Sequence, residues 1–180
     1  MRELGLHILD ALENSLAAGA TCVELTIEED LAADRLVITV HDNGRGMSAE
    51  QLACVFDAFY TTRTTRHVGL GVPLFKAAAE RCNGDLTITS QVGEGTTLQA
   101  VFQHSHIDRA PLGNIQSTLL AFILFGSCDL HYVHRINGRE FEFHTADMRT
   151  ELEDIPLTHP AVRDWLQEFI AAGEAELRQN

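Results

Sequence analysis

Three side chains near the start of the chain could do chemistry together if residues 3–18 form a helix. Apolar residues recur there at helical spacing. Asp10 and Asn14 are four residues apart and so lie on one helical face, which His7 shares. A carboxylate beside an amide suits a divalent metal ion and an activated water. The alternative interpretation is an ordinary solvated helix face.

A second group directly follows an expected strand over residues 35–41. Asp42 stands at the end of that strand, and Gly44 and Gly46 come next. A carboxylate there can accept a hydrogen bond from an exocyclic amine such as that of adenine. The glycines let a flat ligand approach the backbone closely. By itself, Asp-Asn-Gly is also typical of an ordinary turn.

Positive charge and glycine meet in the segment 59–71. Arg63 and Arg66 are cations in an otherwise acidic chain, and Gly69 and Gly71 lead into an expected helix. The free N–H groups at a helix start bind anions. The segment therefore favours a phosphate ligand over a plain loop.

The elements that must position these groups are predicted from hydrophobic periodicity and turn residues. Ser48 and Gln51 form a capping box that begins a short helix. The glycine-rich turn 93–97 is fully explained by a hairpin. The remaining expected elements are strands 22–28, 35–41, 85–90 and 96–102, and a helix from Gly71 to Asn83-Gly84. This order predicts an α+β fold with helices on one face of an antiparallel or mixed sheet.

The chain beyond about residue 105 has a different pattern. We expect a helix over 115–125, a hairpin of strands 129–136 and 139–145 around Asn137-Gly138, and a helix from Pro160. One hairpin face should be apolar and the other exposed to solvent. The solvent-exposed face is expected to carry His131, Arg135, Glu140, Glu142 and His144.

Two groups of histidines suggest metal binding but have simpler explanations. His104, His106 and Asp108 form a cluster for which a polar turn between domains is favoured over a metal site, since the sequence fixes no further ligand. His131 and His134 are separated by an odd number of strand positions. They should therefore point to opposite faces and cannot chelate together.

Composition excludes several classes of protein. The chain has 180 residues, enough for one domain with a small appendage, and a formal net charge of −13. That charge argues against nucleic-acid binding. No membrane-spanning segment is expected, because the longest apolar run is Leu119–Phe125. No signal-peptide core is expected either, because the chain starts Met1-Arg2-Glu3-Leu4 without an apolar run. Four widely spaced cysteines fit reduced thiols in a cytoplasmic protein.

Taken in order, these motifs resemble the ATP-binding domain shared by gyrase, Hsp90, histidine kinases and mismatch-repair ATPases, the GHKL superfamily. The segment Glu13–Thr21 is similar to the mismatch-repair form of the first motif, and 59–71 is closer to histidine kinases. The resemblance covers about residues 3–103, and the chain has no Walker-type phosphate loop. It implies a two-layer α/β sandwich over residues 1–104 and a small α/β appendage over 105–180.

The resemblance also implies a role for each motif residue. Asn14 would ligate Mg²⁺, and Asp42 would bind the adenine amine with Thr97 in support beside it. Asp10 stands where hydrolysing members place a glutamate as general base, and it is one methylene shorter. The other implied ATP-binding residues are Gly44 and Gly46 in the adenine pocket, and Arg63, Arg66, Gly69, Leu70 and Gly71 near the phosphates.

The function this implies is Mg-ATP binding in bacterial signalling or regulation, with phosphate transfer to a separate protein. The alternative is a non-catalytic ATP/ADP sensor that acts through its C-terminal extension. A clamp ATPase of the DNA-repair type fits the acidic charge poorly. We expect no autophosphorylation on histidine, because the nucleotide fold begins almost at Met1 and leaves no upstream helical hairpin. The expected partners are therefore ATP or ADP and a protein phosphoacceptor.

Overall fold

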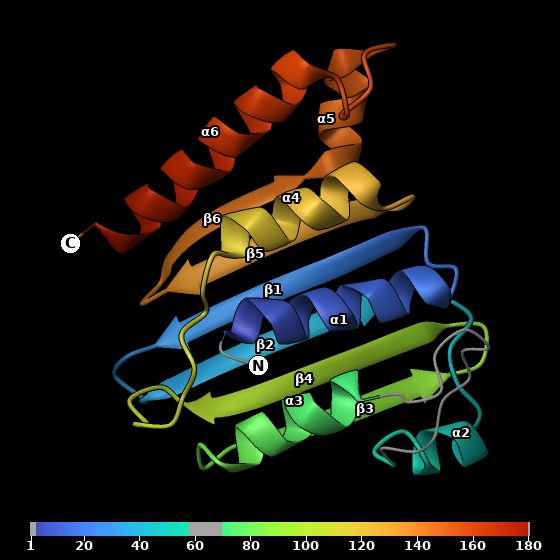
Figure 1. The fold of residues 1–180 in the computed structure, drawn as a ribbon, viewed down its shortest axis with the longest axis vertical. Helices are drawn as coiled ribbons and strands as arrows, with labels where there is room; N and C mark the ends of the chain where they lie inside the picture. The colour runs from blue at the N-terminus through green and yellow to red at the C-terminus, as the bar shows by residue number, and fades with distance from the viewer. Residues whose placement is uncertain (1–2, 58–69, 180) are drawn as a thin grey trace.

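The computed structural model describes residues 3–57 and 70–179 (Figure 1). In these residues six strands form one mixed sheet in the order β3-β4-β2-β1-β5-β6. The strands are β1 (Cys22–Asp30), β2 (Arg35–Asp42), β3 (Asp85–Gln91), β4 (Gly95–Gln103), β5 (Asp129–Ile136) and β6 (Arg139–His144). The helices are α1 (Leu4–Ala17), α2 (Ala49–Ala53), α3 (Gly71–Glu80), α4 (Ile115–Phe125), α5 (Thr145–Leu152) and α6 (Pro160–Arg178). None of these described helices is long and apolar enough to cross a membrane.

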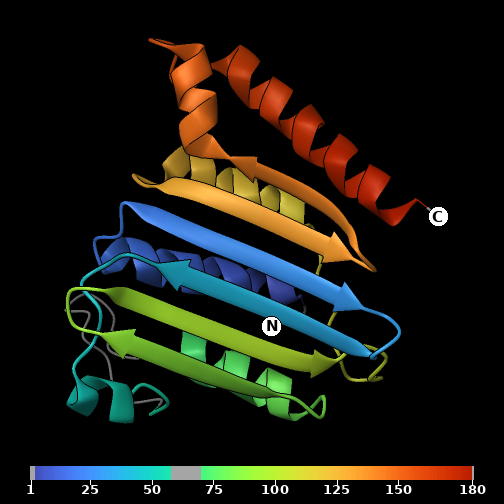
Figure 2. The ribbon, with the colours of Figure 1, turned by 180° about the vertical axis from the view of Figure 1, so that it is seen from behind.

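Helices α1, α3 and α4 cover one face of the sheet, and Figure 2 shows the opposite face without helices. Strands β1 and β2 pair antiparallel, as do β2 with β4 and β3 with β4. Apolar side chains alternate along the strands, so that Val23, Leu25 and Ile27 of β1 are fully buried beneath the helices. The predicted α+β class is confirmed, and so is the capping box of Ser48 and Gln51 at the start of α2.

The C-terminal extension continues the same sheet. Strand β5 pairs in parallel with β1 along its whole length, and β6 pairs antiparallel with β5. Both turn residues of this hairpin have positive φ, 49° at Asn137 and 82° at Gly138, which matches the predicted two-residue turn. The division of the chain into domains 1–104 and 105–180 remains a prediction, although the two parts share one sheet.

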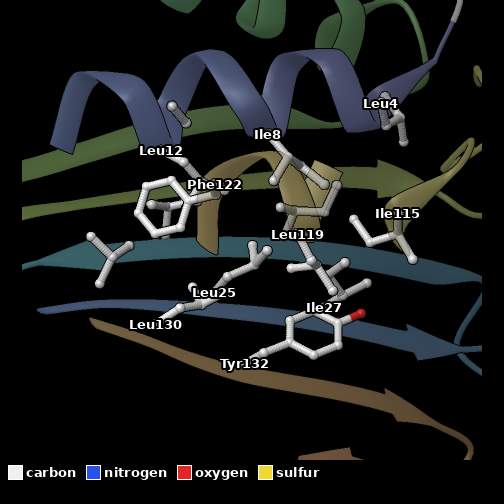
Figure 3. Close-up of a cluster of buried hydrophobic side chains, with 14 of the residues drawn as sticks. Leu4, Ile8, Leu12, Leu25, Ile27, Ile115, Leu119, Phe122, Leu130 and Tyr132 are labelled. Carbon is white, nitrogen blue, oxygen red and sulfur yellow. The ribbon is translucent and has the colours of Figure 1, made fainter. Parts of the chain in front are cut away.

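The main hydrophobic core lies between the sheet and helices α1 and α4 (Figure 3). Leu4, Ile8 and Leu12 point from α1 toward the sheet, and Leu119 of α4 lies beside them. All four side chains are fully buried. At about 1.5–3 kcal/mol for each fully buried side chain of this size, this seam stabilises the docking of both helices.

One helix was not expected from the sequence. The second hairpin strand was predicted to run to residue 145, but the chain begins helix α5 there instead. Thr145 Oγ1 accepts a hydrogen bond from the N–H of Leu130 and donates one to Asp129, so tertiary contacts fix the start of the helix. Few apolar residues occur in α5, and the periodicity on which a helix prediction depends is absent.

Candidate functional site

The carboxylate of Asp42 is buried at the end of β2, with a residue exposure of 5%. The hydroxyl of Ser15 on α1 donates to its Oδ2 at 3.0 Å, and the N–H of Gly44 donates to its Oδ1 at 2.9 Å. A buried carboxylate oxygen can accept more than one hydrogen bond. Asp42 is therefore oriented by the protein while it keeps capacity for an external donor.

The two glycines after Asp42 allow the chain to pack where no other residue would fit. A Cβ on Gly44 would lie 2.8 Å from Cβ of Ala18 on the chain leaving α1. Gly46 has a φ of 65°, and its Cβ would overlap the carbonyl oxygen of Gln91. The loop thus lies tightly against α1 on one side and the β3–β4 turn on the other.

Asp10 of α1 meets the first residue of α3. An ideal Cβ on Gly71 would be 3.3 Å from both Cβ and Oδ2 of Asp10, so the two helices approach closely at this point (Figure 1). Asn14 is exposed one turn further along α1, and Leu70, directly before α3, is also exposed. The structure therefore brings Asp10 to the N-terminus of α3, which is the expected anion-binding end.

Three of the expected phosphate-binding residues, Arg63, Arg66 and Gly69, lie outside the described residues. Their assignment stays a prediction. Within the described residues the expected phosphate-binding end comprises Leu70 and Gly71, and the opposing α1 face carries Asp10 and Asn14.

Thr97 is not brought to Asp42. It pairs with His41 across β2 and β4, and the Nδ1 atom of His41 lies 2.9 Å from Thr97 Oγ1. Because successive strand residues point to opposite faces, both side chains lie on the sheet face opposite Asp42. The residue paired with Asp42 is Thr96, whose Oγ1 lies 2.9 Å from Oγ of Ser90.

Sequence reasoning did not assign three residues that support this site. Ser15 orients Asp42, and Thr96 lies on the same face of the sheet as Asp42. Asn43 accepts hydrogen bonds from the N–H groups of Thr21 and Cys22, which fastens the loop to the start of β1. For Thr96 a signal was present, since strand alternation places it with the apolar residues of β4.

His7 is buried between α1 and α3 and does not share an accessible face with Asp10. Its ring stacks on Phe75 of α3, with centroids 4.9 Å apart and an interplanar angle of 11°. Burial lowers the pKa of His7 to about 4, so the ring is neutral at physiological pH. Its Nδ1 has no hydrogen-bond partner among the described residues. His7 therefore acts as a packing residue that sets the spacing of the two helices.

The described residues contain no group of three or more histidine, cysteine, aspartate or glutamate side chains able to hold a metal. His104 instead lies 2.7 Å from a carboxylate oxygen of Glu29, and His106 Nδ1 accepts the N–H of Asp108. Mg²⁺ differs from such metals because it commonly keeps its waters and binds one or two protein ligands plus substrate phosphates. The side chain of Asn14, exposed on α1 one turn beyond Asp10, is of the type that fits that requirement.

Helices α1 and α3 thus lie on one face of the sheet, beside a buried carboxylate and a tightly packed glycine loop. The sequence model of the histidine kinase-, DNA gyrase B-, and HSP90-like ATPase family matches residues 2–106. This is more than half of the chain, and the chain belongs to that family. Membership implies ATP binding by the matched segment.

Sensor kinases of bacteria are among the similar curated proteins. The heme sensor protein HssS of Staphylococcus saprophyticus is 33% identical over 97 residues, which are 53% of this chain and 20% of that protein. Sensor protein BceS of Halalkalibacterium halodurans is 31% identical, over 53% of this chain and 30% of that protein. Sporulation kinase C of Bacillus subtilis is 31% identical, over 52% of this chain and 22% of that protein. The chain thus spans less than a third of each of these relatives.

A solved structure supports the fold independently. The crystal structure of the N-terminal domain of a DNA repair protein aligns with a TM-score of 0.54 at 14% identity. The alignment covers 79% of this chain and 52% of the other, more of this chain than the family match does. At this identity the likeness concerns the fold alone.

Proposed function

We propose that this protein binds Mg-ATP in a bacterial signalling or regulatory system and transfers the γ-phosphate to a separate protein. The observation that carries the proposal is the buried Asp42 carboxylate, held by Ser15 and Gly44 at the end of β2. Such an anion favours a ligand with an exposed N–H donor, and the exocyclic amine of adenine is one. Guanine presents a carbonyl oxygen at the equivalent position, which the carboxylate repels.

The residues around Asp42 would divide the work of holding the nucleotide. Gly44 and Gly46, which let the loop after Asp42 pack tightly, would line the adenine pocket, and the N-terminus of α3 at Gly71 favours the negative phosphates. Asn14 would give its amide oxygen to a Mg²⁺ ion shared with those phosphates, and the ion would neutralise part of their charge. Asp10 would act as general base where water is the acceptor. We assign Arg63, Arg66 and Gly69 to the phosphates, on the sequence motif alone.

The phosphoacceptor in this proposal is another protein. Among the described histidines, His7 and His134 are buried. His41, His131 and His144 lie on strand positions of the helix-free face, away from α1 and α3. None of these five rings is placed for in-line attack on a phosphate at the start of α3. The net charge of −13 and the free thiols lead us to propose a cytoplasmic protein that does not bind nucleic acid.

The alternative, an ATP/ADP sensor without turnover, is favoured by the contacts between α1 and the C-terminal extension. The N–H groups of Leu4 and Gly5 donate to the carbonyls of Pro111 and Leu112, both at 2.9 Å. Thr118 of α4 lies against Gly5, where an added Cβ would be 2.9 Å from its Oγ1. A nucleotide that moves α1 would therefore move the start of the extension as well.

Titration calorimetry with ATP, ADP and GTP, each with and without Mg²⁺, tests the binding proposal. We expect ATP and ADP to bind and GTP to bind much more weakly. Mg²⁺ should raise the affinity for ATP more than the affinity for ADP. Equal affinities for ATP and GTP would contradict the role of Asp42. The absence of binding by any of the three nucleotides would reject the proposed function.

Product analysis then separates the two candidates. Incubation with γ-labelled ATP should give label on an added protein fraction and no acid-labile phosphate on the isolated chain if the chain is a kinase. A sensor should leave ATP intact while its extension changes exposure to protease. Stoichiometric phosphohistidine on the isolated chain would contradict the assignment of a separate acceptor.

A further inference from the structure

Buried charged groups join the family-matched segment to helix α6. His134 on β5 has no exposed surface. Its Nδ1 lies 3.0 Å from both carboxylate oxygens of Glu174 on α6, and its Nε2 lies 3.1 Å from Oε1 of Glu29 on β1. Glu29 is six residues along β1 from Val23, which pairs with Asp42. This separation of roughly 20 Å places the cluster at the other end of the sheet from the nucleotide site.

Only a protonated His134 can satisfy both neighbours. A neutral imidazole carries one N–H, whereas the imidazolium carries two and can donate to Glu174 and Glu29 together. Burial by itself lowers the pKa of His134, but its hydrogen bonds to the two carboxylates outweigh burial and raise that pKa. Burial by itself raises the pKa of Glu29. The hydrogen bonds from His134 and His104 outweigh burial and lower that pKa to about 2. The neutral-pH state is therefore a cation between two anions.

The remaining polar groups of this cluster contact the carboxylates. The hydroxyl of Tyr132 donates to Glu174 at 2.7 Å, and His104 Nε2 lies 2.7 Å from Oε2 of Glu29. The guanidinium of Arg178 lies 3.4 Å from Glu174 and 4.0 Å from Glu29, with about half of its side chain exposed. His134 is thus the cation that the protein fully shields from water.

The other elements packed around His134 supply no further charge. Its partner on β6 is Phe141, and α4 contains no titratable side chain. When the imidazolium loses its proton, one ring nitrogen turns a lone pair toward a buried carboxylate. An unpaired buried charge of this kind is strongly destabilising. This destabilisation should detach the element that is held least firmly in the cluster.

That attachment is the C-terminal half of α6. The helix buries Leu166 and Ile170 and packs Gly173 against the ring of Phe141, where a Cβ would overlap. Beyond Gly173, the buried residues of α6 are Glu174 and Leu177. In Figures 1 and 2 this end of α6 lies at the same end of the sheet as the C-terminal ends of β1 and β5. Its docking depends largely on the charges.

We propose that Glu29, His134 and Glu174 form a proton-dependent latch that holds the C-terminal half of α6 on β1 and β5 and releases it in alkaline solution. The folded form raises the pKa of His134. The stabilisation is therefore complete below the unfolded value of about 6.5 and is lost as pH rises through the higher folded value. The latch does not depend on nucleotide binding.

The test uses the wild-type chain without nucleotide. Two-bond ¹H–¹⁵N spectra should show protons on both ring nitrogens of His134 at neutral pH, and hydrogen exchange should report amide protection along α6. We expect protection at residues 174–178 to fall about tenfold for each unit of pH between about 6.5 and the pKa of the folded His134, and to level off above that pKa, after correction for base-catalysed exchange. Protection along α1 should stay constant. Trp165, the sole tryptophan of the chain, supplies a second signal from α6.

Two variants and a matched control complete the test. His134→Gln should leave 174–178 weakly protected at every pH, and Glu174→Gln should lower the midpoint of the His134 titration by about one unit. His131→Gln is the control, because His131 is on the same strand but on the helix-free face. It should leave the profile unchanged.

Three results would overturn the latch. One is unchanged protection of 174–178 in the wild type between about pH 6.5 and the midpoint of the His134 titration. Another is an alkaline loss of protection that persists in folded His134→Gln. The third is a folded His134 that carries only one ring proton at neutral pH. Failure of ATP binding would leave each of these measurements intact, so the two proposals can fail separately.

Discussion

The hydroxyl of Ser15 on α1 donates a hydrogen bond of 3.0 Å to Oδ2 of Asp42, 27 residues away at the end of β2. This bond links the helix that carries Asp10 and Asn14 directly to the carboxylate assigned to adenine. With Gly44 holding the other oxygen, the carboxylate is oriented before a ligand arrives. Preorganisation of this kind lowers the entropic cost of binding.

Asp42→Asn should weaken ATP binding by roughly ten- to a hundredfold. The amide offers one oxygen where the carboxylate offers two, and its NH₂ group faces a donor from either Ser15 or Gly44. Loss of a hydrogen bond to a charged group costs about 1.5–3 kcal/mol. Calorimetry measures the effect, with Asp30→Asn at the opposite end of β1 as a control of equal charge change. Unchanged affinity in a folded Asp42→Asn protein would remove the adenine assignment.

Thr96 and Thr97 offer a test of which sheet face meets the nucleotide. Thr96 pairs with Asp42, whereas Thr97 pairs with His41 on the other face. We expect Thr96→Val to lower ATP affinity about fivefold, the value of a typical hydrogen bond, and Thr97→Val to have no effect. The two variants are matched in chemistry and adjacent in sequence. The opposite ranking would restore the role that the sequence motif alone gave to Thr97.

Gly46→Ala and Gly93→Ala separate steric overlap from backbone strain. Both glycines have positive φ, 65° and 81°, but nothing lies within 4 Å of a Cβ on Gly93, whereas a Cβ on Gly46 would overlap Gln91. Gly93→Ala should lower the free energy of unfolding by about 1 kcal/mol. Gly46→Ala should lower it by a further 1–3 kcal/mol or so, because packed backbone must move. Urea denaturation measures both, and equal losses would contradict the tight packing of the Gly46 loop.

Asn14 and Asp10 should separate metal binding from turnover. Asn14→Ala should reduce the gain in ATP affinity that Mg²⁺ provides while sparing ADP binding measured without metal. Asp10→Asn should bind ATP like the wild type and lose hydrolysis, if water is an acceptor. Affinity is measured by calorimetry and turnover by phosphate release. Equal slow hydrolysis in both proteins would favour the sensor over the enzyme.

His7 should make the fold sensitive to mild acid. Its pKa is lowered to about 4 by burial, so its contribution to stability is complete above the unfolded value of about 6.5 and is lost as pH falls toward 4. The full loss is about 3 kcal/mol. His7→Phe keeps the stack on Phe75 and cannot titrate, so its urea midpoint should fall less than that of the wild type between about pH 7 and pH 4.5. Parallel curves for the two proteins would show that folding does not lower the pKa of His7.

Much of the local structure was accessible from the sequence, because it is specified by near neighbours. Alternation placed His131 and His134 on opposite faces, as the structure confirms with one ring partly exposed and the other fully buried. Asn137-Gly138 predicted the hairpin turn correctly because few residues tolerate positive φ. Helix α5 was missed because its start depends on Asp129 and Leu130, which lie on another element.

The sequence by itself determined the elements other than α5, their apolar faces and the motifs of the ATP-binding family, since these depend on spacing within a few residues. The tertiary structure decided which separate elements meet. Strand register put Thr96 rather than Thr97 opposite Asp42, and the parallel pairing of β5 with β1 brought His134 to Glu29, 105 residues away. Local periodicity carries no information about such pairings. These pairings are fixed because the apolar face of every strand must be buried on the same side of one sheet. A shift of the register by one residue would turn every side chain of that strand to the other face.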